Sequence, residues 1–247
     1  MAILFREETP ADKAEAEQTG NISGRLLKRL PARAAIELIA QGADVNIADD
    51  VGQTALMIAA FPPFNQEKFR ALVTAGANVE ARRNDGLTGL LLACAGGESE
   101  AAEEWVRAGA DVRVRCPENS TPLMLGARWP HIVALLLASG ADPNAADKDG
   151  HTPLAYGVIQ QCSVSAQGER TAIRQLLEAG ADPHRADNEG RTPTDHARQA
   201  VKAEELHLET MLALSGRSAE ELSPDTFNEG ALHARAILSI RREYGGK

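Results

Sequence analysis

Short apolar runs recur along the chain, and each of them ends at a glycine. The clearest runs are residues 132–137, before Gly140, and residues 173–177, before Gly180. Glycine often follows the last turn of a helix, because it adopts the left-handed backbone conformation needed there. Each run therefore predicts a helix that stops at its glycine. The glycine begins a Gly-Ala-Asp or Gly-Ala-Asn tripeptide at Gly42, Gly76, Gly109, Gly140 and Gly180.

A threonine follows each of these glycines after a fixed twelve residues: Thr54, Thr88, Thr121, Thr152 and Thr192. All variation in length falls between the threonine and the next glycine. Threonine is a good helix N-cap, and proline suits the first helical position, as in Thr152-Pro153-Leu154. Each threonine therefore predicts the start of a first helix. The unit is helix, turn, helix and projecting loop, and a fixed period of this kind indicates a stacked array of repeats.

The chain resembles the ankyrin repeat family. Residues 147–154 read Asp-Lys-Asp-Gly-His-Thr-Pro-Leu, and residues 140–144 read Gly-Ala-Asp-Pro-Asn. The resemblance covers residues 21–215 and implies an all-α ankyrin-repeat solenoid of about five or six helix-turn-helix units. It also implies projecting hairpin loops and a concave face that binds partners. The family often has histidine directly after Thr-Pro-Leu, so we expect a histidine bond between loops to be missing throughout. The residues at that position are Met57, Leu91, Met124, Ala155 and Asp195.

The two ends of the chain depart from the repeat pattern. We expect residues 1–20 to be a partly disordered N-terminal segment and residues 216–247 to be a C-terminal helical cap. In the tail, Thr226 and Glu229 have the spacing of a capping box before a helix of about residues 227–243. We interpret this tail as a lid over the last repeat. The alternative is a short helix that binds a partner.

The composition excludes several classes of function. A net charge of −9 argues against general nucleic-acid binding. The charged start of the chain argues against a signal peptide, and no apolar run approaches membrane-spanning length. The cysteines form no CxxC motif, which favours a reducing compartment; they are Cys94, Cys116 and Cys162. We therefore expect a cytoplasmic protein that binds neither nucleic acid nor membrane.

No catalytic motif is present in the sequence. There is no P-loop, no HExxH and no GxSxG. The histidines show no spacing to cysteine or aspartate that is typical of a metal site; they are His131, His151, His184, His196, His207 and His233. We therefore predict a protein that is not an enzyme, with no catalytic, cofactor or metal site.

Charged residues gather in the projecting loops, which we call fingers: residues 44–53, 78–87, 111–120, 142–151 and 182–191. The second and third fingers are rich in arginine, which binds carboxylates through paired hydrogen bonds and is enriched in protein interfaces. We expect Arg82, Arg83, Arg113 and Arg115 to form a row that grips an acidic strip on a protein partner. The outer acidic fingers would fix its orientation. The bland alternative is that the exposed loops of any array are charged.

The predicted partner-binding residues are Asp49, Asp50, Arg82, Arg83, Asp85, Arg113, Arg115, Glu118, Asp147, Lys148, Asp149, Arg185 and Trp129. Trp129 belongs to a second edge, made by the turns between helices, at residues 61–64, 128–130 and 160–170. Aromatic residues there could contact a partner. Alternatively, Phe61, Phe64 and Trp129 pack down to close their turns. Trp105 is expected to pack between repeats.

These observations predict recognition of another protein through the fingers and the concave face. An inhibitor, or an antidote to a toxic enzyme, fits an acidic array without other domains. Two other classes stay open. One is an adaptor or structural subunit that joins two proteins. The other is an enzyme accessory that binds a small ligand.

Overall fold

The computed structural model describes residues 31–159 and 166–199, with only the backbone given for residues 166–170. The expectations for residues 1–20, for most of the turn at 160–170 and for the cap at 216–247 lie outside this part of the chain or concern side chains that are not described. The chain divides into two compact units. The first contains residues 1–89 and 107–110, and the second contains residues 90–106 and 111–247.

The first unit is built around three described helices, α3 (Ala32–Ala40), α4 (Ala55–Ala59) and α5 (Gln66–Thr74). Helix α5 packs against both α3 and α4. Thr54 caps α4, because its Oγ1 accepts a hydrogen bond from the backbone N–H of Met57 at 3.4 Å. Leu56, Phe69 and Leu72 are fully buried, and burying such a side chain stabilises a fold by about 1.5–3 kcal/mol.

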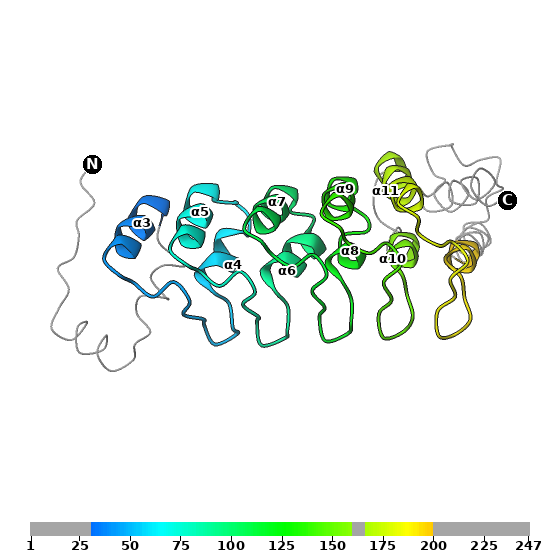
Figure 1. Ribbon diagram of the computed structural model, residues 1–247, viewed down its shortest axis with the longest axis horizontal. Coiled ribbons are helices and arrows are strands. Elements are labelled where there is room, and N and C mark those ends of the chain that lie inside the picture. The colour runs from blue at the N-terminus through cyan, green and yellow to red at the C-terminus, as the bar shows by residue number, and fades with distance from the viewer. Residues whose placement is uncertain (1–30, 160–165, 200–247) are drawn as a thin grey trace, which may run out of the picture. The chain divides into compact units, whose positions relative to one another are not determined.

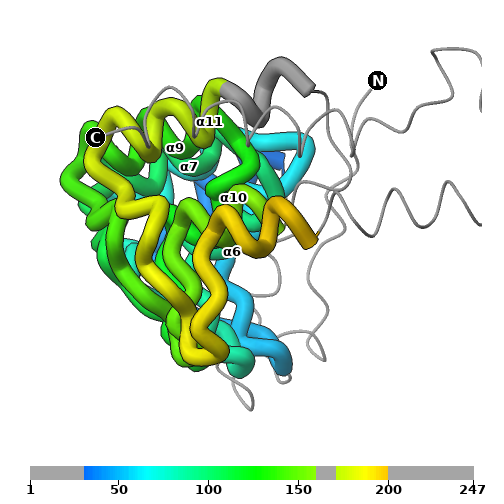
Figure 2. The backbone as a smooth tube through the Cα atoms, turned by 90° about the vertical axis from the view of Figure 1, so that its right-hand side faces the viewer, coloured from blue at the N-terminus to red at the C-terminus, as the bar shows by residue number. Residues whose placement is uncertain are grey.

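Most of the described chain belongs to the second unit. Its helices are α6 (Gly89–Gly96), which begins at the end of the first unit, α7 (Ser99–Arg107), α8 (Pro122–Leu125), α9 (Pro130–Ala138), α10 (Pro153–Ile159) and α11 (Ala166–Glu178). A further stretch is helical from residue 193 to residue 199. Helices α7, α9 and α11 lie in one layer, and α6 and α10 lie in a second layer beside it (Figures 1 and 2).

The predicted starts and ends of the helices are confirmed. In the second unit, Oγ1 of Thr121, Thr152 and Thr192 each accepts a hydrogen bond from the backbone N–H three residues later, at 3.3 Å in all three cases. The five glycines that end the apolar runs have φ between +85° and +90°. The described residues form no β-strand and only two isolated bridges, Ala48–Thr54 and Arg82–Thr88. The fingers are therefore loops that project from a helical array.

The second unit has an apolar core and a closed turn. Trp105 and Leu123 are fully buried. Trp129 packs on Gly97 so closely that a methyl group at position 97 would overlap its indole ring, and the guanidinium group of Arg128 lies 4.8 Å from the centre of that ring. Trp129 therefore closes its turn, as the packing alternative predicted.

The turn at residues 61–64 in the first unit is only partly closed. Phe64 meets Phe69 edge to face, with ring centres 6.1 Å apart, so it packs down as that alternative expected. Phe61 does not, because 36% of its surface stays exposed.

None of the helices in the described part of the chain is long and apolar enough to cross a membrane.

Candidate functional site

The fingers of the second unit are joined at their tips by hydrogen bonds. The backbone N–H of Lys148 donates to the carbonyl oxygen of Glu118 at 3.2 Å, and the N–H of Asn188 donates to that of Asp149 at 2.9 Å. The side chain of Asn188 adds a bond to the carbonyl oxygen of Lys148 at 2.8 Å. Three successive fingers are thus tied into one ladder, although each is an exposed loop.

The same connection occurs in the first unit. The backbone N–H of Asn84 donates to the carbonyl oxygen of Val51 at 3.1 Å, and its side-chain amide donates to that of Asp50 at 2.8 Å. Asn84 and Asn188 therefore make equivalent backbone and side-chain hydrogen bonds in different repeats. An asparagine at this position is a local marker of a tied fingertip.

A second set of bonds connects the fingers at their bases. Nδ2 of Asn144 donates to the carbonyl oxygen of Gly180 at 2.8 Å, and Asn46 makes the equivalent bond to Gly76 at 3.3 Å. Arg113 occupies the same place in its own repeat, and its Nε donates to the carbonyl oxygen of Gly140 at 3.2 Å. We call these hydrogen bonds between fingers, at their tips and bases, the frame. Arg113 is therefore part of the frame and also carries an exposed charge.

The other predicted arginines also bind within the fingers. Nη1 of Arg82 donates to the carbonyl oxygen of Gly86 at 2.8 Å, and Nη1 of Arg115 donates to those of Asn119 and Ala146 at 2.8 Å. Arg83 pairs with Asp85 at 2.9 Å, and Nη1 of Arg185 donates to the carbonyl oxygen of Asn144 at 2.7 Å. Arg82 and Arg83 belong to the first unit, whereas Arg113 and Arg115 belong to the second. The row that would join all four stays a prediction.

Apart from Asp85, which pairs with Arg83, the predicted acidic residues divide into two groups. Asp49 and Asp147 serve their own fingers, because Oδ1 of each accepts the backbone N–H groups two and four residues later. Asp50, Glu118 and Asp149 are exposed at the tips, where Lys148 also lies and pairs with Glu118 at 3.5 Å. The tips thus carry the charges, while the carboxylates at the finger bends hold the loops in shape.

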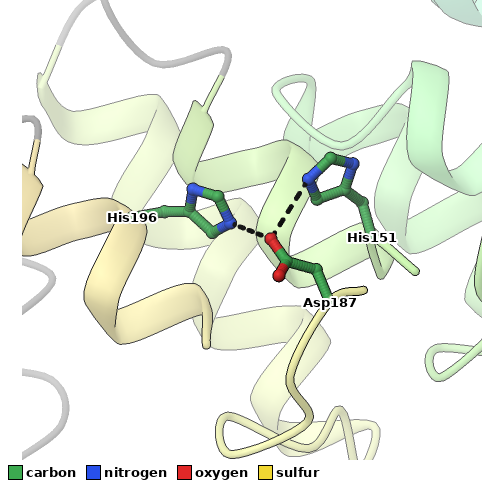
Figure 3. Close-up of side chains that lie close together, drawn as sticks. All are labelled: His151, Asp187 and His196. Atoms are coloured by element: carbon green, nitrogen blue, oxygen red, sulfur yellow. Dashed lines mark hydrogen bonds and ion pairs between the residues drawn. The ribbon is translucent and has the colours of Figure 1, made fainter. Parts of the chain in front are cut away.

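Asp187 is the centre of a polar cluster in the last described repeat (Figure 3). Its Oδ1 accepts the backbone N–H groups of Glu189 and Arg191 at 2.9 Å each. Its Oδ2 lies 2.8 Å from Nε2 of His196 and 3.5 Å from Nε2 of His151. Nε of Arg191 lies 3.2 Å from the same oxygen. Only 2% of the Asp187 side chain is exposed.

The carboxyl group of Asp187 is held in its charged form. Burial by itself would raise its pKa, but hydrogen bonds oppose this effect. The backbone N–H of Arg191, the imidazole of His196 and the backbone N–H of Glu189 all donate to the carboxylate, and together they hold the pKa of Asp187 well below its ordinary value. A buried negative charge is therefore presented to two imidazole rings.

The preceding repeat contains a related arrangement. The hydroxyl of Tyr156 donates to Oδ2 of Asp147 at 2.9 Å and lies 2.9 Å from the hydroxyl oxygen of Ser120. Burial, together with the nearby charge of Asp147, raises the pKa of Tyr156 to about 12. Nδ1 of His151 lies 3.6 Å from Oδ2 of Asp147. His151 therefore stands between the carboxylates of two successive fingers.

These contacts correct one expectation from the sequence. We expected a histidine bond between loops to be missing throughout, but Nε2 of His151 lies 3.5 Å from Oδ2 of Asp187 in the next finger. His196, from the same repeat as Asp187, lies 2.8 Å from this oxygen. One signal could have found the cluster. A ring with a polar group follows the finger aspartate by nine residues in both repeats, as Asp147–Tyr156 and Asp187–His196.

Comparison with known proteins identifies the repeats. The model of the ankyrin repeats (3 copies) family matches residues 59–147 and 90–187. The chain therefore belongs to the ankyrin repeat family, whose members generally act as non-enzymatic modules for protein–protein interaction. A solved structure, the ankyrin repeat protein EF0377, superposes with a TM-score of 0.64 at 26% identity, covering 71% of this chain and 89% of that chain.

Two curated proteins share shorter stretches with this chain. Human ankyrin repeat and KH domain-containing protein 1 is 46% identical over 71 residues, which is 28% of this chain. The E3 ubiquitin-protein ligase KEG of Arabidopsis thaliana is 35% identical over 115 residues, which is 44% of this chain. The matches span only 3% and 7% of those proteins. This chain therefore corresponds to only a small part of either protein.

Proposed function

We propose that this ankyrin array is a non-enzymatic, cytoplasmic protein-binding module that inhibits its partner by covering the partner's active surface. The observation that supports this proposal best is the hydrogen-bonded ladder of fingers in the second unit. Lys148 and Asn188 tie three exposed loops at their tips, and Asn144 ties two of them at their bases. A frame that is ordered before binding loses less conformational entropy when a partner docks.

Charged side chains give this frame its selectivity. Glu118, Lys148 and Asp149 are exposed at the tips, and Arg113 and Arg185 are exposed nearer the bases. Arg113 and Arg185 each donate to one carbonyl of the frame, and a guanidinium group carries five N–H donors. Each can therefore hold the frame and also bind a carboxylate of a partner. Complementary charge of this kind governs partner choice and association rate.

Copurification with the full-length chain followed by binding measurements tests the proposal. The tagged chain is used to isolate partners from its native cell, beside the double variant Arg83→Glu/Arg113→Glu. Affinity for the purified partner is then measured for wild type and variant, together with the partner's activity in the complex. We expect the double variant to bind at least ~10-fold more weakly, which corresponds to about 1.4 kcal/mol.

A matched control separates the effect of losing the positive charge of Arg113 from the effect of losing its hydrogen bond to the next finger. Arg113→Asn removes the positive charge but keeps a side chain that forms the same bond at the equivalent positions Asn46 and Asn144. We expect this variant to keep its stability and to lose part of its affinity. Unchanged affinity in the double variant would contradict a role for these arginines. A partner whose activity is the same in the complex as alone would contradict inhibition.

An adaptor that joins two proteins is the second candidate, and one observation in the first unit favours it. Val51 is 50% exposed on a finger, and Phe61 is 36% exposed in the turn between two helices. Two separate apolar side chains give two candidate contact regions. An adaptor should form a ternary complex that Val51→Asp and Phe61→Asp each reduce to a different binary complex. Loss of the same partner in both variants would oppose this function.

A further inference from the structure

The cluster around Asp187 brings together three groups that bind transition metals. His151, Asp187 and His196 each offer one ligand atom, and these atoms lie within 4.8 Å of one another. Two ligands at about 2.0–2.1 Å from a tetrahedral zinc ion are separated by about 3.3 Å. The contacts of Oδ2 of Asp187 with the two Nε2 atoms, at 2.8 and 3.5 Å, lie on either side of this value. A small adjustment of two rings is enough to admit a cation.

We propose that His151, Asp187 and His196 form a binding site for a divalent transition metal of the zinc type. Two imidazole nitrogens and one carboxylate oxygen make a ligand set suited to Zn²⁺ and Co²⁺, with a further position for water. The three side chains come from two successive fingers and from the helical stretch that begins at residue 193 (Figure 3). The metal would therefore fasten the last two described repeats together.

The surrounding groups orient the three ligands. Oδ1 of Asp187 is fixed by two backbone N–H groups, so Oδ2 is the oxygen directed at the imidazoles. Oδ2 of Asp147 lies 3.6 Å from Nδ1 of His151, on the opposite side of the ring from Asp187. A carboxylate behind a histidine ligand selects the tautomer whose other nitrogen binds the metal. His151 is therefore set up to offer Nε2.

Arg191 is the group that competes with a cation. Its Nε lies 3.2 Å from Oδ2 of Asp187, while its Nη2 is held by Glu189 at 2.9 Å. The guanidinium can leave Oδ2 to a metal and still keep a carboxylate partner. This arrangement yields a result that a purely structural hydrogen-bond cluster does not predict. Replacing Arg191 by glutamine should strengthen metal binding, because it removes a positive charge from the site.

The test is titration of the full chain, purified without a histidine tag, with Zn²⁺ by calorimetry and with Co²⁺ by visible absorption. We expect one equivalent of metal per chain, a Co²⁺ spectrum typical of four or five ligands, and a higher melting temperature with Zn²⁺. His151→Gln and His196→Gln should each weaken binding by at least ~10-fold. His184→Gln, on the exposed part of the last finger, should bind as wild type does. Arg191→Gln should bind more tightly than wild type.

Three outcomes would overturn the proposal. The first is the absence of saturable one-equivalent binding by wild type. The second is binding by both His151→Gln and His196→Gln as tight as that of wild type. The third is binding by a folded Arg191→Gln variant that is no tighter than that of wild type. Circular dichroism of the metal-free proteins establishes that each variant is folded. If His196→Gln unfolds, His151→Gln decides alone, since His151 lies farther from the carboxylate and contributes less to the metal-free fold.

Discussion

The hydroxyl group of Tyr156 donates a hydrogen bond to Oδ2 of Asp147, nine residues earlier in the chain, at 2.9 Å. One repeat later, His196 makes the equivalent contact with Asp187 at 2.8 Å. The two repeats share one geometry, in which a ring at the start of a helix reaches the bend of its own finger. They differ in chemistry, because a phenol is a poor metal ligand at neutral pH and an imidazole is a good one.

Loss of the Tyr156 hydroxyl should destabilise the second unit. We expect Tyr156→Phe to lower the free energy of unfolding by about 1.5–3 kcal/mol, because it removes a half-buried hydrogen bond to a carboxylate and the contact with Ser120. Chemical denaturation monitored by circular dichroism measures the change. Ser120→Ala, which removes the other contact of the same hydroxyl, should cost less, since Asp147 keeps its partner. A larger loss for Ser120→Ala would show that the bond to Asp147 is the weaker one.

The link made by Arg113 should be replaceable by asparagine but not by alanine. Arg113→Ala removes the bond to the carbonyl of Gly140 and should cost about 0.5–1.5 kcal/mol of stability. Arg113→Asn should stay within about 0.5 kcal/mol of wild type, because Asn144 makes this bond at the equivalent position. Urea unfolding of the three proteins checks the order. Equal stability of the alanine and asparagine variants would show that the link contributes nothing.

Two glycines with the same backbone conformation should respond differently to alanine. Gly150 and Gly180 have φ of +85° and +88°, which strains any side chain by about 1–2 kcal/mol. At Gly150 a Cβ would also lie 2.9 Å from the backbone nitrogen of Asn188, whereas at Gly180 it would meet nothing within 4 Å. Gly150→Ala should therefore be the more destabilising in thermal unfolding. A smaller effect for Gly150→Ala than for Gly180→Ala would mean that the hydrogen-bonded fingertips shift at little cost to make room for the methyl group.

The thiol of Cys94 should make stability depend on alkaline pH. Burial raises the pKa of Cys94 from 9.0 to about 12, so the folded protein keeps this thiol protonated while the unfolded chain ionises it. The contribution of Cys94 to stability is then complete below about pH 8.5 and declines as the pH rises toward 12. The difference in unfolding free energy between wild type and Cys94→Ala should shrink between about pH 8 and about pH 10.

Urea titrations at several pH values measure this difference. Val133→Ala is the control, since it also truncates a fully buried residue but removes no titratable group. Its difference from wild type should stay constant with pH. If the Cys94→Ala difference is equally constant, Cys94 is accessible to water in the folded protein.

The repeat pattern predicted most of the fold because its signals are local. Thr152 caps the helix that follows it, and Gly180 ends the helix before it, so each acts within one turn of backbone. The fingers were predicted for the same reason, since they are what remains between these markers. The C-terminal cap was also predicted, but it lies beyond the described residues.

The cluster at Asp187 was missed because its members act across repeats. His151 and His196 have no local relation in the sequence, and only the stacking of successive units brings both to one carboxylate. The arginines were placed correctly on the fingers, but their bonds to backbone carbonyls were not predicted. Such a bond depends on where the neighbouring finger lies, as with Arg113 and the carbonyl of Gly140. A pattern within one repeat carries no information on that distance.

The tied fingertips of the second unit constrain how this surface can evolve. The backbone N–H groups of Lys148 and Asn188 each donate to a carbonyl oxygen of the preceding finger. Lengthening the finger in the middle would therefore break its bonds to both neighbouring fingers. All differences in repeat length fall instead between the threonine of one unit and the next glycine, in the segment that contains the turn between the two helices. A homologous protein that binds a different partner should therefore differ in the side chains at the fingertips, while the length and spacing of the fingers stay the same. Among such homologues we expect substitutions at the fingertips, and insertions only between the threonine of a unit and the next glycine.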